Sequence, residues 1–216
     1  MKTIALVTQK GGAGKSTLAF SLGVAALETG ERVCLVDLDP LATLTNWGVT
    51  RDETDVPVLL STADKLPAAL AMLAAHGVTL AILDTPGAGG ATAEAAMAAA
   101  QLCIIPARPN AFDLRASEIT RKALKKAHCD YVFVLNQCPP AQQSARIEEG
   151  VAALEAMGGL LSPLVRARVD YQEAARLGLG VTELNPNGPA ASEIRALWAS
   201  LKKRLAKCAK PARKVA

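Results

Sequence analysis

The feature that most constrains the fold is the run KGGAGKST, which spans residues 10–17. An apolar stretch over residues 4–7 precedes it and predicts a short buried strand, and an apolar stretch over residues 18–27 follows it and predicts a helix. A glycine-rich loop that joins a strand to a helix and ends in Gly-Lys-Ser is the context in which this motif binds phosphate. The run therefore predicts a P-loop and not an ordinary glycine-rich turn.

Each part of this loop has a physical role in holding a nucleotide. Glycines let successive backbone N–H groups turn inward around a phosphate, because no Cβ blocks the approach, and the helix N-terminus adds partial positive charge. Lys15 can reach the outer phosphates, and the Ser16 hydroxyl can hold a magnesium ion. The residues expected to bind ATP in this loop are Gly11, Gly12, Ala13, Gly14, Lys15, Ser16 and Thr17.

Carboxylates follow two other predicted strands. Residues 32–36 are followed by the segment DLDP, which contains Asp37 and Asp39, and residues 78–83 are followed by Asp84. Ligands of open α/β sheets bind at the carboxyl ends of the strands. An aspartate after an aliphatic strand, in a chain with a P-loop, is a Walker B element that binds magnesium or its waters. We therefore expect a Mg²⁺ site that includes Ser16, Asp37 and Asp84.

Strand and helix patterns alternate along the 216 residues. Further strands are predicted at 58–60, 102–106, 131–135 and 164–168, and further helices at 67–76, 91–100, 110–126, 141–157 and 190–207. Six or seven strands in this alternation predict an α/β fold with a mostly parallel central sheet and helices on both faces. We expect a single P-loop domain over residues 1–207 and a basic C-terminal tail over residues 208–216.

The composition argues against several classes of protein. No apolar run approaches the ~18 residues of a membrane span, and the chain begins with a strand and not with a secretory signal. The five cysteines are an odd number and none forms a C-x-x-C pair, so neither a disulfide framework nor a cysteine metal site is expected. These features indicate a cytoplasmic protein with reduced thiols.

A second lysine, Lys10, opens the glycine run, whereas an ordinary P-loop needs only Lys15. This pair resembles the deviant Walker A box of the ParA/MinD family of ATPases. The resemblance implies that Lys10, Lys15 and Asp39 are catalytic, with Lys10 reaching the partner's nucleotide across a dimer and Asp39 near the attacking water. In that family an asparagine at the place of Asn136 faces the adenine, although a loop-forming role is an equal alternative. The family's usual glutamine after the Asp-x-Asp-Pro box is Leu41 here.

The resemblance spans nearly the whole chain and implies an ATP-dependent homodimer that binds DNA nonspecifically and positions a plasmid, a chromosome or another cargo. A small DNA-binding or cargo-adaptor protein is the implied partner, and it stimulates a slow hydrolysis. The short length and residues 44–47 look most like the small ParF-type partition ATPases, with no room for a helix-turn-helix before Met1. The implied location is the nucleoid in the cytoplasm.

Two basic groups in the sequence suit a DNA backbone. The segment after Ser200 contains seven basic residues and no acidic residue. The other group consists of Arg121, Lys122, Lys125 and Lys126. Each group is also compatible with an ordinary solvated helix face or tail.

Two other functions remain open. Apolar residues at helical spacing lie beside basic residues 202–204 in the last predicted helix, namely Leu197, Trp198, Leu201 and Leu205. Such a helix can lie on anionic lipid, as in a MinD-like membrane-surface ATPase, but the same spacing fits a stripe that faces the core. A metabolic P-loop enzyme is the third hypothesis, although the doubled lysine argues against a simple kinase and no acceptor-binding domain is evident.

Overall fold

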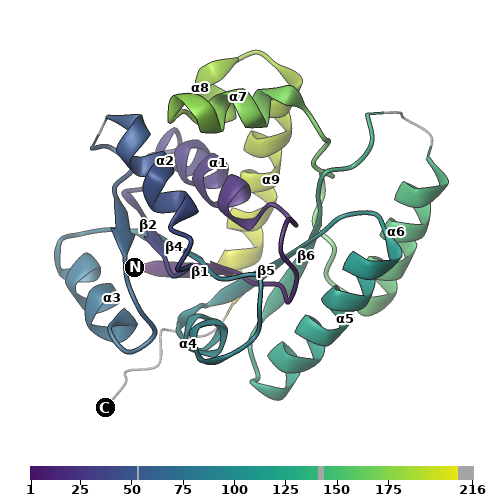
Figure 1. The fold of residues 1–216 in the computed structure, drawn as a ribbon, viewed down its shortest axis with the longest axis horizontal. Helices are drawn as coiled ribbons and strands as arrows, with labels where there is room; N and C mark the ends of the chain where they lie inside the picture. Colours follow the sequence, from purple (N-terminus) through teal and green to yellow (C-terminus); the bar gives the residue numbers. More distant parts are fainter. Residues whose placement is uncertain (53, 141–143, 209–216) are drawn as a thin grey trace.

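Six short aliphatic segments form a parallel sheet in the computed structural model, which describes residues 1–52, 54–140 and 144–208 (Figure 1). Valine, isoleucine and leucine dominate these segments, as expected for strands that are buried on both faces. The sheet order is β3-β2-β4-β1-β5-β6. The strands are β1 (Lys2–Leu6), β2 (Val33–Asp37), β3 (Val58–Leu60), β4 (Leu80–Asp84), β5 (Leu102–Ala107) and β6 (Tyr131–Leu135).

Helices cover both faces of the sheet, so the predicted α/β class is confirmed. The helices are α1 (Lys15–Leu27), α2 (Thr43–Arg51), α3 (Leu66–Ala75), α4 (Ala91–Ala99), α5 (Ala111–Lys126), α6 (Ala145–Met157), α7 (Val169–Leu177), α8 (Val181–Leu184) and α9 (Pro189–Ala206). Successive strand residues point to opposite faces. Ile4 and Leu6 thus join the core beneath α1, α2 and α7–α9, whereas Ala5 and Val7 join the core beneath α3–α6 (Figure 1).

The strand order places several loops at one edge of the sheet. β1 lies between β4 and β5, which follow each other in the chain, so the connection through α4 crosses from one side of β1 to the other. The segments after β1, β2, β4, β5 and β6 all leave the sheet at its carboxyl edge, since all the pairings are parallel. Such an edge, where the strand order reverses, is where ligands of open α/β sheets bind.

The strand predicted at residues 164–168 is wrong. This segment runs beside β6 but makes only local contacts: the Val165 N–H donates to the Leu135 carbonyl at 3.0 Å, and isolated bridges join residues 133 to 160 and 138 to 166. Pro163 lies between the two bridges and has no N–H to donate to a ladder, so the pairing is interrupted. The helix predicted over 141–157 begins at Ala145, and residues 141–143 lie outside the described residues.

The apolar stripe of the last helix faces the core. Leu197, Trp198, Leu201 and Leu205 are at most 5% exposed and belong to the cluster that packs under α1. The Trp198 Nε1–H also donates to Thr29 Oγ1 at 2.9 Å. Because this stripe is used for packing, it does not form a lipid-binding face, and the observation that suggested a membrane-surface ATPase has a structural explanation. Of the predicted tail, residues 209–216 lie outside the described residues.

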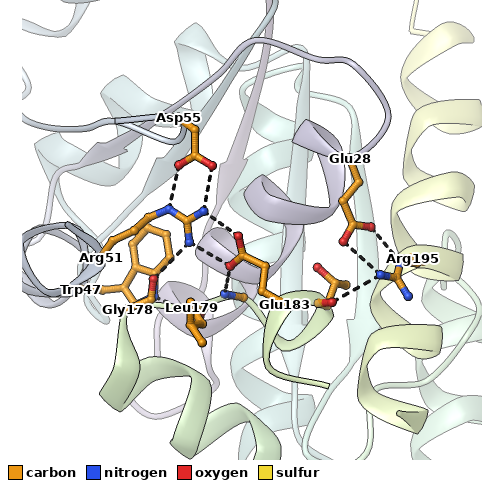
Figure 2. Close-up of polar contacts among 10 residues, drawn as sticks. Glu28, Trp47, Arg51, Asp55, Gly178, Leu179, Glu183 and Arg195 are labelled. Atoms are coloured by element: carbon orange, nitrogen blue, oxygen red, sulfur yellow. Dashed lines mark hydrogen bonds and ion pairs between the residues drawn. The ribbon is translucent and has the colours of Figure 1, made fainter. Parts of the chain in front are cut away.

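A buried arginine joins α2 to the turn between α7 and α8 (Figure 2). The Arg51 side chain is 1% exposed, and its guanidinium bonds both oxygens of Asp55 at 2.9 and 3.0 Å and both oxygens of Glu183 at 2.7 and 2.9 Å. It also donates to the Gly178 carbonyl at 3.1 Å and lies 5.3 Å from the Trp47 ring. We call Arg51, Asp55, Gly178 and Glu183 the Arg51 cluster. It fixes the C-terminal end of α2.

Two expectations about the whole chain can be compared with the structure. All five cysteines are free, which agrees with the absence of a disulfide framework. Within the described residues, no helix combines the length and the apolar character needed to cross a bilayer.

Candidate functional site

The predicted phosphate-binding loop leads from β1 into α1 at the carboxyl edge of the sheet. Gly14 is the N-cap residue of α1, with a left-handed conformation at φ 87°, and no side chain caps the helix. A Cβ at Gly14 would come within 2.5 Å of the Asn136 amide nitrogen, so both the backbone and the space require glycine there. The first N–H groups of α1 therefore have no capping side chain, which is the arrangement that binds an anion.

Lys15 is largely buried beside this helix end, with 7% of the residue exposed. Burial lowers the pKa of its ammonium, and the nearby carboxylates of Asp84 and Asp39 oppose that shift. A buried lysine next to an uncapped helix N-terminus provides the positive charge that a phosphate needs. The structure thus brings Lys15, Asp39 and Asp84 close together.

Asp37 and Asp84 lie side by side at the ends of β2 and β4, where they are paired in the register of the sheet. Both are fully buried, but their surroundings differ. Asp37 accepts hydrogen bonds from the Asp39 N–H at 3.0 Å and from the N–H and hydroxyl of Thr45 at 2.8 and 2.9 Å. No donor makes a well-formed hydrogen bond to either oxygen of Asp84. Burial raises the pKa of this carboxyl to about 7, and the nearby Ser16 hydroxyl and Lys15 ammonium oppose that shift.

This difference bears on the predicted Mg²⁺ site. A buried carboxylate is costly unless cations or donors compensate it. Asp84 has the Lys15 ammonium and the Ser16 hydroxyl near it but no well-formed hydrogen bond, so its oxygens can accept a metal ion or its bound water. Asp37 holds the loop that follows β2, and its expected part in the magnesium site stays a prediction. In the part of the chain that is described, no group of three or more His, Cys, Asp or Glu residues is placed to hold a metal. A magnesium ion at this edge would therefore need Ser16 and phosphate oxygens as well as Asp84.

Asp39 lies in the loop between β2 and α2. Its Oδ1 accepts the Leu41 N–H at 3.0 Å, which is an Asx turn. Leu41, at the position of the expected glutamine, is 78% exposed and packs against nothing in the core. The loop therefore presents Asp39 toward Lys15 and an apolar side chain toward solvent.

The segment after β4 touches the phosphate-binding loop directly. A Cβ at Gly87 would lie 2.8 Å from Gly11 Cα and 2.9 Å from its nitrogen, which is closer than real Cβ contacts. Thr85 fixes the start of this segment, because its hydroxyl donates to the Leu6 carbonyl at 2.8 Å. A movement of the phosphate-binding loop would therefore displace the segment 85–90 through direct backbone contact.

Two side-chain amides after β6 support the same loop. Asn136, which is 5% exposed, donates to the Ala13 carbonyl at 2.8 Å, and Gln137 donates to the Gly12 carbonyl at 3.0 Å. Asn136 therefore contacts the nucleotide loop itself, and its expected contact with adenine stays a prediction. Gln137 was not among the predicted site residues, although an adjacent pair of amides at the end of a strand is visible in the sequence.

Lys10 contacts residues that the sequence analysis did not single out. Its ammonium forms an ion pair with Asp113 in the first turn of α5, and Arg108 binds the same carboxylate, with 3.0 Å between Arg108 Nε and Asp113 Oδ1. The Asn110 side chain caps this turn by accepting the Asp113 N–H at 3.0 Å. A helix was predicted to start near residue 110, but the sequence indicated no partner for Lys10.

Comparison with known proteins gives consistent matches. The family model for the CobQ/CobB/MinD/ParA nucleotide binding domain matches residues 4–181. The maintenance of carboxysome distribution protein A of Halothiobacillus neapolitanus is 29% identical over 201 residues, which are 88% of this chain and 91% of that protein. The chromosome-partitioning ATPase Soj of Thermus thermophilus is 31% identical over 210 residues, which are 91% of this chain and 75% of that protein.

A solved structure agrees with the fold. The septum site-determining protein MinD from Pyrococcus horikoshii, complexed with Mg-ADP, superposes with a TM-score of 0.74 at 23% identity and covers 97% of this chain and 99% of that chain. The match shows that the two proteins share the same fold.

Proposed function

This chain belongs to the CobQ/CobB/MinD/ParA nucleotide-binding family, and from that premise we propose that it is a positioning ATPase. It binds ATP with Mg²⁺, dimerises in that state, binds DNA nonspecifically and moves a cargo when a partner protein stimulates hydrolysis. The observation that carries the proposal is the uncapped start of α1, with Lys15 and the buried Asp84 carboxylate beside it. The two relatives above act on different cargoes by name, a carboxysome and a chromosome.

Residues of several segments contribute to nucleotide binding in different ways. Backbone N–H groups of residues 11–17 and the Lys15 ammonium hold the phosphates. Ser16 and Asp84 hold the magnesium ion, which supplies charge neutralisation at the phosphates when it is bound. Asp37 keeps the loop 38–44 in place through its bonds to the Asp39 N–H and to Thr45.

Hydrolysis requires an oriented water and compensation of the charge on the phosphoryl oxygens. In this proposal Asp39 orients the water from one subunit, and Lys10 of the other subunit supplies the positive charge. Because each site is complete only in the dimer, hydrolysis is coupled to dimerisation. A small DNA-binding or cargo-adaptor protein that stimulates this step is the proposed partner, and the nucleoid is the proposed location.

The DNA-binding part of the proposal is supported by where the basic groups lie. The ends of α5 and α9 are neighbours, because Arg204 pairs with Asp130 just after α5 at 3.5 Å. Lys125, Lys126 and Lys203 are exposed in this region. They provide phosphate contacts without aromatic residues for base stacking, so binding is dominated by counterion release and is independent of sequence.

The experiment for dimerisation compares sedimentation of the protein with Mg²⁺ and either a nonhydrolysable ATP analogue or ADP. We expect a dimer with the analogue and a monomer with ADP. Lys10→Ala should still bind ATP through Lys15 and the loop amides but should lose hydrolysis. A wild-type protein that stays monomeric with the analogue would refute the proposed mechanism.

The experiment for DNA binding is a fluorescence-anisotropy titration of two unrelated duplexes at several salt concentrations. Binding should require ATP, and a dimer that contacts about six phosphates should lose about a thousand-fold in affinity between roughly 50 and 200 mM salt. Replacing Lys202, Lys203 and Arg204 by glutamine should weaken binding to both duplexes to the same extent. Equal binding with ATP and ADP would exclude an ATP-controlled switch.

A further inference from the structure

Lys10 is held by its own subunit. Its ammonium pairs with Asp113 Oδ2 and lies 5.6 Å from the centre of the Phe112 ring, and both residues belong to the first turn of α5. The Lys10 side chain is 30% exposed, whereas that of Asp113 is 1% exposed. The ammonium thus lies at the surface, on top of a buried carboxylate.

Asp113 has a second cationic partner that comes from the adjoining loop. Arg108 Nε lies 3.0 Å from Oδ1, and Nη2 lies 3.3 Å from Oδ2. Burial acts to raise the pKa of Asp113, but hydrogen bonds from Arg108 and Lys10 hold it below its usual value. A buried charge that loses its sole partner is strongly destabilised. Because Arg108 remains bonded to Asp113, Lys10 can leave without turning Asp113 into an unpaired buried charge.

We propose that Asp113 is the resting partner of Lys10, which holds this lysine in the free subunit and releases it to the partner's nucleotide on dimerisation. The inference rests on the proposed function, in which Lys10 acts across the dimer. A lysine bonded to its own α5 must break that bond to reach phosphates in another subunit. Two Lys10–Asp113 pairs are therefore broken in each dimer, and Arg108 alone neutralises each Asp113 afterwards. Asp113 acts through Lys10 and is a positioning residue.

The test is the dissociation constant of the dimer, measured by sedimentation with Mg²⁺ and a nonhydrolysable ATP analogue. Asp113→Asn keeps the shape and an acceptor for Arg108 but removes the charge that holds Lys10. A partly exposed ion pair contributes about a three-fold factor, so the loss of two pairs should tighten the dimer by roughly ten-fold. Arg108→Gln should have the opposite effect, because Lys10 is then the remaining cation on Asp113 and is held more strongly.

Lys10→Gln provides the control for effects that do not pass through this lysine. In that background Asp113→Asn should leave the dissociation constant unchanged, which a merely structural role of Asp113 does not predict. An unchanged or weaker dimer for Asp113→Asn alone would overturn the inference while the proposed function stands. If Asp113→Asn does not fold, Arg108→Gln decides, and a dimer as tight as the wild type would overturn the inference. A wild-type chain that does not dimerise with the analogue would remove the proposed function instead.

Discussion

Replacing Arg51 by methionine should destabilise the fold by about 3 kcal/mol. The Arg51 guanidinium donates two hydrogen bonds to Asp55, two to Glu183 and one to the Gly178 carbonyl, from a side chain that is 1% exposed. Removing one partner of a buried ion pair costs about 3–5 kcal/mol. The lower end applies because the side chains of Asp55 and Glu183 are 33% and 30% exposed, so water can hydrate both carboxylates. Methionine keeps an apolar chain beside Trp47.

The assay for this prediction is urea unfolding followed by circular dichroism. In a parallel thermal unfolding experiment, a loss of about 3 kcal/mol corresponds to a fall in Tm of roughly 6–12 °C for a chain of this size. Arg176→Met is the matched control, since its pair with Glu173 is 65% and 46% exposed and should contribute less than about 1 kcal/mol. The prediction is refuted if the unfolding free energy of Arg51→Met lies within about 1 kcal/mol of the wild-type value at the same m-value. In that case the cost of desolvating the Arg51 cluster equals the free energy that its hydrogen bonds and ion pairs contribute.

Three further predictions concern pH, the loop after β4 and Asp39. Hydrogen bonds from Arg51 hold the pKa of Asp55 below its usual value. The stability that this ion pair contributes is therefore present at neutral pH and is lost as the pH falls through the lowered pKa. The difference in unfolding free energy between wild type and Arg51→Met should narrow below about pH 4. Gly87→Ala should weaken binding of a fluorescent ATP analogue, because its Cβ meets the backbone of Gly11 at 2.8 Å, whereas Gly89→Ala, with its nearest neighbour at 3.4 Å, should bind as the wild type does. Asp39→Ala should reduce hydrolysis at saturating ATP by about ten-fold or more while the ATP dimer persists, and unchanged turnover would exclude Asp39 from water positioning.

The parts of the site that the sequence predicted are those encoded by neighbouring residues. The glycine loop, Lys15 and the aspartates at strand ends belong to short local patterns, and the parallel sheet then brings Asp37 and Asp84 together by register. The parts that it missed depend on contacts between distant segments. Lys10 meets Asp113, which lies 103 residues away, and Gln137 meets Gly12, which lies 125 residues away.

The wrong strand at residues 164–168 has a related cause. Its residues favour a strand, but the pairing with β6 depends on whether the whole edge can form a ladder, and Pro163 prevents this. The stripe on α9 shows the same limit from the other side. Helical spacing of Leu197 and Leu201 established an apolar face, and the packing under α1 was needed to decide what covers it.

The Asp37 carboxylate binds both ends of the segment from Asp39 to Thr45, because the Asp39 N–H donates to one oxygen and Thr45 donates to the other. A change in the backbone of this segment is therefore confined to residues 40–44, between the two attached residues, where Leu41 is exposed. The C-terminal end of α2 is held in place by the hydrogen bonds of the Arg51 cluster. A rearrangement of residues 40–44 would therefore change the exposed surface around Leu41 while α2 keeps its place. Amide hydrogens of residues 41–43 should exchange faster than those of residues 46–51.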